Sequence, residues 1–182
     1  MSNFKSTAEQ TDTAQHTKAG TIKAKADAAH SLRDLFVDEL KDIYWAENSL
    51  TKAIPKMISN ASNPEMVKGF EKHLAETQNQ IKRLEDVFTS LGEKAEAKKC
   101  EAMAGITKEA EEIMSESEMG NVRDAGILSA ARKVEHYEIA TYSTLVAIAN
   151  KLGEKKAAKL LQDNLNEEQK TDDKLYKMCQ SM

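Results

Sequence analysis

Hydrophobic residues from Ser31 onward recur every three or four positions, the spacing of one face of an α-helix. This pattern predicts four long amphipathic helices, near residues 31–61, 64–91, 121–152 and 154–178, and a shorter one near 96–118. No segment shows the alternation of hydrophobic and polar residues that is typical of a β-strand. The sequence therefore predicts an all-α protein.

Capping residues mark the ends of the predicted helices. Ser31 is placed to cap the first helix. The first helix is expected to end before Asn63, which can cap the next helix, and Pro64 suits the first turn of that helix. Gly92 and Gly153 are placed to end the helices that precede them. Two tightly joined helices, a long crossing connection and two more tightly joined helices are the order of a ferritin-like bundle. We therefore expect a ferritin-like four-helix bundle in which the short helix is the crossover.

The composition indicates one folded domain and an N-terminal tail. With 182 residues, of which 40% are hydrophobic and 31% charged, the chain is long enough for a four-helix core. Residues 1–29 contain almost no large hydrophobic side chains and are predicted to be disordered. Residues 30–182 are predicted to form the bundle.

Charge and cysteine content limit the partners that the sequence predicts. A net charge of −4 without a basic block gives no reason to expect nucleic-acid binding. No hydrophobic run approaches the roughly 20 residues of a membrane span. Two cysteines are too few for a disulfide framework, and the N-terminal segment lacks the hydrophobic core of a signal peptide, so we expect a cytoplasmic protein.

Acidic residues lie on the hydrophobic faces of three of the long predicted helices. Glu47 is four residues after Ile43 and three before Leu50, and Glu135 and Glu138 share the hydrophobic face of the 121–152 helix. A single glutamate in such a position is usually an edge residue whose carboxylate stays in water. When several helices each place a glutamate at a similar depth, it is less plausible that all of these carboxylates stay in water.

The last helix repeats the pattern. Glu168 and Asp172 fall near the direction of Leu161, whereas Glu167 is expected to face solvent. On the 64–91 helix the position is less central, because Glu76 lies on the flank of the hydrophobic face together with His73 and Gln80. We treat these three residues of the 64–91 helix as one candidate group.

Buried carboxylates need a cation or strong hydrogen-bond donors, and a pair of metal ions inside a helical bundle supplies that charge. Oxygen-rich sites suit hard or borderline cations, so we expect Fe or Mn, with two ions per subunit. The candidate metal ligands are Glu47, Glu76, Glu135, Glu138, Glu168 and Asp172, with His73 and Gln80 as further possibilities. Tyr44 and Tyr142 are either ordinary core polar groups or donors and one-electron relays next to the site.

Five segments resemble the YciE/YciF-like family of ferritin-like proteins. They are KVEHYEIATY at 133–142, ELKDIYWAE at 39–47, HLAET at 73–77, CEAMAG at 100–105 and AAKLL at 157–161. The resemblance runs from about Leu32 to Met178. It implies a bundle of four long helices with a crossover helix, dimer formation, a dinuclear metal centre and a link to bacterial stress responses.

The sequence departs from the general ferritin-like pattern, which places Glu-x-x-His on two helices. The residue three positions after Glu76 is Asn79, and the residue three positions after Glu168 is Thr171, so neither expected position holds an imidazole. His73 can supply one nitrogen if its helix turns inward. The predicted site is therefore dominated by carboxylates.

Three functions are compatible with these residues. The first is a dimetal carboxylate protein that binds iron or manganese and reacts with oxygen or peroxide under stress. The second is a non-catalytic helical dimer that acts through protein contacts and has a structural or vestigial metal site. The third, iron storage, requires a closed shell for which the sequence shows no surfaces. Because His136 and Tyr137 are expected on the outer side of their helix, we expect a homodimer.

Overall fold

The computed structural model describes residues 20–182, so most of the predicted N-terminal tail, residues 1–19, lies outside the described residues. Five helices follow one another along the described chain, and no strand occurs in it. Their bounds are α1 Leu32–Asn60, α2 Pro64–Leu91, α3 Glu101–Glu116, α4 Asn121–Leu152 and α5 Lys155–Gln180. The long helices agree with the predicted ranges within two residues, whereas the short helix α3 begins five residues later than predicted.

Local capping explains where the helices begin and end. Ser31 Oγ accepts a hydrogen bond from the Asp34 backbone N–H at 3.1 Å, and the Asp34 carboxylate accepts one from the Ser31 N–H at 2.9 Å. Asn63 accepts from the backbone of α2, in front of Pro64. Gly92 and Gly153 end α2 and α4 in the left-handed conformation, with φ of 72° and 79°.

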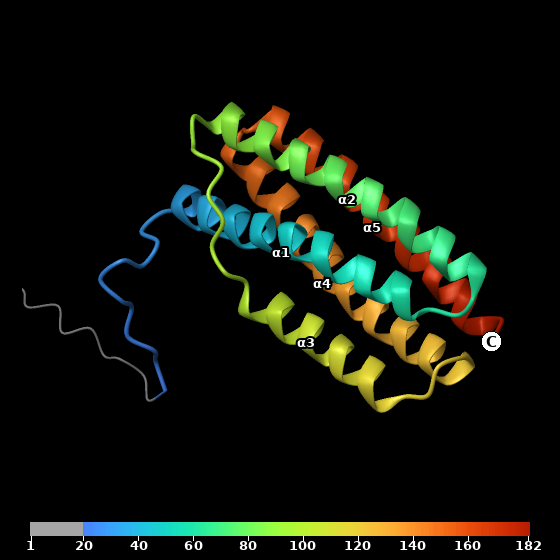
Figure 1. Cartoon of the computed structure of the whole chain (residues 1–182). Coiled ribbons are helices and arrows are strands. Elements are labelled where there is room, and N and C mark those ends of the chain that lie inside the picture. The colour runs from blue at the N-terminus through green and yellow to red at the C-terminus, as the bar shows by residue number, and fades with distance from the viewer. Residues whose placement is uncertain (1–19) are drawn as a thin grey trace, which may run out of the picture.

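The four long helices form two antiparallel hairpins that pack face to face (Figure 1). Helix α1 packs on α2 and α4, while α5 packs on α2 and α4, so each long helix has two long neighbours. The segment after α2 crosses the end of the bundle and leads into α3, which lies outside the four-helix core against α1 and α4. This order and arrangement confirm the predicted ferritin-like bundle with a crossover helix.

Buried residues in the long helices alternate between steps of three and four, as in helices that cross at a shallow angle. In α1 the series is 36, 40, 43, 47, 50, 54 and 57, and in α2 it is 66, 70, 73, 77, 80, 84, 87 and 91, with Ala46 and Phe88 buried next to it. Most of these side chains are hydrophobic and form one continuous core. Most of the buried polar residues, by contrast, lie at corresponding depths in the four helices and form one polar layer.

Helix α3 is held against the bundle by shape and by polar contacts. Gly126 of α4 leaves room for Ile113 of α3, since a Cβ atom at residue 126 would overlap with the Ile113 side chain. At the start of α3, Cys100 Sγ lies 3.1 Å from the Tyr137 hydroxyl, which donates to Asp42 Oδ2 at 2.5 Å. Tyr137 is thus half-buried beneath α3, which corrects the expectation that it faces outward.

The turn between α1 and α2 is tied to the start of α4. The buried Asp124 carboxylate accepts hydrogen bonds from the Ser62 backbone N–H at 2.7 Å and from the Ser62 hydroxyl at 2.6 Å. This contact fixes the depth of one hairpin relative to the other. Among the helices of residues 20–182, none combines the length and the hydrophobicity that crossing a membrane requires.

Candidate metal centre

A layer of polar side chains crosses the core about halfway along the long helices. All four long helices contribute to it, and each of its side chains is at most 4% exposed. The layer consists of Glu47 from α1, His73, Thr77 and Gln80 from α2, Glu135, Glu138 and Tyr142 from α4, and Asn164 and Glu168 from α5. The three–four spacing of each helix points these side chains inward together with the hydrophobic residues above and below them.

Four residues form the tightest part of this layer. One ligand atom from each of His73, Glu135, Glu138 and Glu168 can be chosen so that all four atoms lie within 4.8 Å of one another. His73 Nε2 lies 3.2 Å from Glu135 Oε1. Around one first-row metal ion, ligand atoms bound at about 2.1 Å are about 3 to 4 Å apart. The group therefore needs only small side-chain movements to surround a cation.

Glu47 faces the same group from α1, and two neutral side chains orient it. The Tyr142 hydroxyl donates a hydrogen bond to Glu47 Oε1. Asn164 Nδ2 in turn donates to the Tyr142 hydroxyl oxygen at 3.0 Å. Glu47 Oε2 is buried and has no hydrogen-bond partner, so this oxygen is free to bind a ligand.

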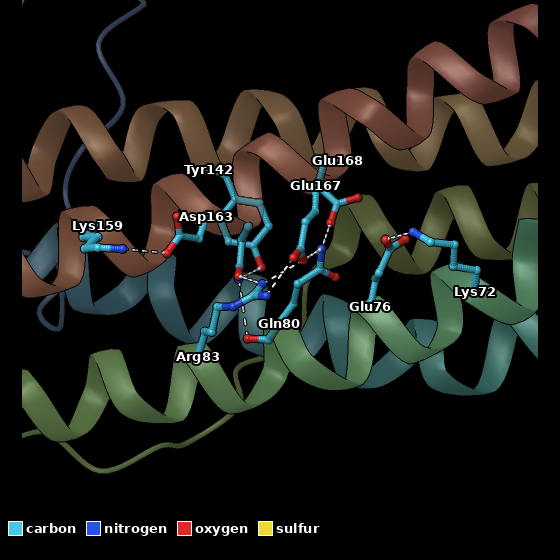
Figure 2. A network of polar contacts seen from close by, with 10 residues as sticks. Lys72, Glu76, Gln80, Arg83, Tyr142, Lys159, Asp163, Glu167 and Glu168 are labelled. Carbon is cyan, nitrogen blue, oxygen red and sulfur yellow. Dashed lines mark hydrogen bonds and ion pairs between the residues drawn. The ribbon is translucent and has the colours of Figure 1, made fainter.

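Gln80 connects the layer to the surface, as Figure 2 shows. Its amide Nε2 donates to Glu168 Oε1 in the layer and to Glu167 Oε2 at 3.2 Å outside it. Arg83 binds both oxygens of Glu167 at 2.7 Å and also donates to Asn164 Oδ1 at 2.8 Å. The expectation that Glu167 faces solvent is wrong, because it is mostly buried in this ion pair at the edge of the layer.

Burial makes the carboxylates of the layer difficult to ionise. Loss of hydration, followed by repulsion from Glu168, raises the pKa of Glu47 to about 8. Burial likewise raises the pKa of Glu135 to about 8, although a hydrogen bond with Glu168 opposes the shift. Burial and neighbouring acids raise the pKa of Glu138 and of Glu168 well above the usual range. In the absence of a bound cation, burial thus favours the protonated, uncharged form of these four carboxyl groups.

Several polar atoms of the layer have no hydrogen-bond partner within the described chain. Buried polar atoms are almost always paired, so a cluster of unpaired ones requires an explanation. They are Glu47 Oε2, His73 Nδ1, Thr77 Oγ1, Gln80 Oε1, Glu135 Oε2, both oxygens of Glu138 and Glu168 Oε2. Most of them are carboxylate oxygens, which fit metal ions that prefer oxygen ligands. The residues present therefore fit the metal centre that the sequence predicted.

The structure brings six of the eight candidate ligands into this layer: Glu47, His73, Gln80, Glu135, Glu138 and Glu168. Glu76 lies outside it, forms an ion pair with Lys72 and keeps 22% of its side chain exposed. It lines a small cavity of about 40 Å³ between α2 and α5 that also touches His73. On α2, His73 and Gln80 thus occupy the inward positions that Glu76 was considered for.

Asp172 also lies at the edge and not in the layer. Arg132 holds its carboxylate with contacts of 2.8 and 3.2 Å, and His136 Nε2 lies 3.2 Å from its Oδ2. Burial opposes ionisation of Asp172, but the Arg132 guanidinium outweighs it and lowers the pKa of this carboxyl group. Asp172 already has a cation as partner, in contrast to Glu168 one turn earlier.

Sequence reasoning did not identify Asn164 as part of the site. Asn164 is completely buried and bridges α2, α4 and α5 through Arg83, the Gln80 backbone and Tyr142. A signal was available, because residue 164 is three positions after Leu161 and four before Glu168. An asparagine with that spacing lies on the inner face, where it needs polar partners.

The fold and the site together define a ferritin-like helical bundle with a buried cluster of carboxylates and one imidazole. The model of the family described as a domain of unknown function, DUF892, matches residues 31–182, and the chain belongs to this family. The chain is 45% identical over 146 residues to the protein YciF of Escherichia coli strain K12, which covers 80% of this chain and 88% of that protein.

Two solved structures are similar to the whole bundle. YcfI of Rhodopseudomonas palustris, provisionally described as a structural protein, has a TM-score of 0.82 and 44% identity over 84% of this chain and 98% of its own. The Escherichia coli stress protein YciF has a TM-score of 0.80 and 43% identity over 83% of this chain and 96% of its own. The chain is thus a member of a family that includes a bacterial stress protein.

Proposed function

We propose that this protein is a dimetal carboxylate protein that binds iron or manganese and reacts with oxygen or peroxide during bacterial stress. The observation that carries the proposal is the set of unpaired carboxylate oxygens from Glu47, Glu135, Glu138 and Glu168, all buried at the same depth of the bundle. Burying these carboxyl groups in ionised form is costly unless cations balance their charge. Two divalent ions would balance these four carboxylates.

The donor set favours particular metals. Glu47, Glu135, Glu138 and Glu168 supply oxygen atoms, and His73 supplies a nitrogen. No cysteine of the described chain belongs to the layer, so soft ions such as Cu(I) are a poor match. Iron and manganese accept mixed oxygen and imidazole ligands and, when bound, supply one-electron chemistry toward oxygen or peroxide.

The remaining residues of the layer orient the ligands and keep out water. Tyr142 and Asn164 hold Glu47, and Gln80 holds Glu168. Hydrophobic residues such as Leu50 and Leu161 close the core on either side of the layer. A dry, pre-oriented site binds a cation without having to reorganise its ligands first. The stress association rests on the similarity to YciF.

Metal analysis of protein purified without chelator and without added metal, combined with a peroxide-consumption assay, tests this proposal. We expect iron or manganese to copurify, the melting temperature to fall when a chelator removes it, and peroxide to be consumed only by the loaded protein. Absence of bound metal after incubation with excess Fe²⁺ or Mn²⁺ would refute the proposal.

The competing proposal is a non-catalytic homodimer that acts through protein contacts. The provisional description of YcfI as a structural protein favours it. Bound metal that raises the melting temperature without any oxygen or peroxide consumption would support this alternative. Light scattering tests the homodimer in either case, and a shell of roughly twelve or more subunits would contradict it.

A further inference from the structure

The metal ligands are distributed unevenly across the layer, and the imidazole shows this most clearly. Among the histidines of residues 20–182, only His73 is buried, and it lies next to Glu135. Glu47 has the Tyr142 hydroxyl as its polar neighbour instead. A position near His73 therefore has a nitrogen ligand, whereas a position near Glu47 has none.

The position near His73 is complete by itself. His73, Glu135, Glu138 and Glu168 supply four atoms within 4.8 Å of one another, enough to bind one ion with four protein ligands. Both oxygens of Glu138, Oε2 of Glu135 and Oε2 of Glu168 are buried and unpaired. None of these oxygens has to give up a hydrogen bond within the described chain when an ion binds.

The position near Glu47 is poorer in ligands for two reasons. One oxygen of Glu47 is already bound by Tyr142, so only Oε2 is free. On the same side of Glu168, where Asn164 links Gln80 to Tyr142, α2 supplies the neutral Gln80. Its amide N–H groups point at the carboxylates of Glu168 and Glu167, and its unpaired Oε1 is a neutral oxygen that attracts a cation less strongly than a carboxylate does. An amide nitrogen cannot bind a cation, and its hydrogens repel one.

From these contacts we infer that the two metal positions are unequal, one tight at His73, Glu135, Glu138 and Glu168, and one weak beside Glu47. This inference rests on the proposed metal-binding function and adds to it the order in which the two positions fill. A second ion would have Glu47 as its own ligand and would depend on Glu138 or Glu168, which also belong to the first position. Repulsion from the first ion lowers the affinity of the second further.

The test is a titration of the chelator-treated full-length protein with Mn²⁺ alone, with free Mn²⁺ measured by electron paramagnetic resonance and heat by calorimetry. We expect two binding steps per chain whose dissociation constants differ by at least about tenfold. His73→Gln removes a proposed ligand and should weaken the tight step by at least about 10- to 100-fold, the range that is typical of losing a residue that only orients a ligand. The matched control is His136→Gln, because His136 is on α4 but exposed, and it should leave both steps unchanged.

A second variant tests the weak position and keeps an oxygen atom at residue 80. Gln80→Glu replaces the amide next to Glu168 with a carboxylate and should strengthen the weak step while the tight step changes little. Circular dichroism and the melting temperature show whether each variant is folded. If His73→Gln is unfolded, the affinity of the second step in Gln80→Glu still tests whether the weak position lies next to residue 80.

Three results would overturn the inference. Two equal steps in the wild-type protein, equal weakening of both steps by His73→Gln, or a single step even at high Mn²⁺ would each show that the positions are not a tight and a weak one. Complete absence of Mn²⁺ and Fe²⁺ binding is a different result, because it refutes the proposed function itself. The failure of the inference and the failure of the function are therefore distinguishable.

Discussion

Glu167 and Glu168 are neighbours in the sequence, but their environments differ. Glu167, at the edge of the layer, is held by both arms of Arg83, and Asp172 is held in a similar way by Arg132. Glu168, in the centre, accepts a hydrogen bond from the neutral Gln80. Its other neighbours in the layer include three further carboxyl groups, which make its ionisation more difficult. The chain thus supplies arginine side chains as partners at the edge, whereas the described residues of the central layer include no lysine or arginine, and the proposed metal ions would supply the positive charge there.

The largest effect is expected from removing a central carboxylate. Glu138→Gln or Glu168→Gln should abolish most Mn²⁺ or Fe²⁺ binding, because each removes a ligand, while the metal-free bundle remains as stable or becomes more so as repulsion falls. Metal stoichiometry and thermal melting measure both effects. Glu71→Gln is the control, since Glu71 lies exposed on α2. Unchanged stoichiometry in both central variants would leave the acids as a purely structural cluster.

The second effect concerns pH. In the metal-free protein, burial raises the pKa of Glu47 and of Glu135 to about 8, so the folded state holds protons that the unfolded chain releases above about pH 5. The free energy of unfolding should therefore fall as the pH rises from about 5 to 8, by up to about 1.4 kcal/mol per pH unit for each group. Urea unfolding at several pH values measures this slope. Bound metal should make this slope smaller. A metal-free protein whose free energy of unfolding rises over this pH range would contradict the expected protonation of the central carboxyl groups.

A smaller effect is expected at the edge. Arg83→Met removes the cation of Glu167 and a donor to Asn164, and should lower the free energy of unfolding by about 1 to 2 kcal/mol. Metal stoichiometry should stay unchanged, because no metal ligand is removed. Loss of metal from this variant would show that the edge pair is part of the centre.

The smallest effect is expected for Asp172→Asn. Its ion pair with Arg132 is partly exposed, so the change should cost about 1 kcal/mol or less. Because Asp172 lies outside the group of four, metal binding should remain within about twofold of the wild type. A large loss of metal affinity would return Asp172 to the set of ligands.

The sequence predicted the fold and most of the site because both follow from helical periodicity. The helix ends depend on local residues such as Ser31, Asn63 and Gly92, whose capping roles do not depend on distant parts of the chain. Glu47 and Glu138 were identified because they replace hydrophobic residues in an otherwise regular series. A polar residue at an inward position is conspicuous when its neighbours in the series are hydrophobic.

Helix α2 was harder to orient for a physical reason. Its inward series contains His73, Thr77 and Gln80 in succession, so the hydrophobic face is interrupted in the middle and its direction is poorly defined there. Following the three–four steps from Met66 and Phe70 would have placed His73 and Gln80 inside and Glu76 at the edge. Partners such as Arg83 for Glu167 depend on how α2 and α5 are packed, which periodicity alone does not determine.

The order of the helices has a consequence for how the chain folds. Helices α1 and α2 are joined by residues 61–63, and α4 and α5 by residues 153–154, so each hairpin forms through contacts that are close in sequence. Glu47 and His73 belong to the first hairpin, whereas Glu135, Glu138 and Glu168 belong to the second. Docking of the two hairpins is therefore the step that removes these acids from water, and we expect protons or metal ions to set its rate.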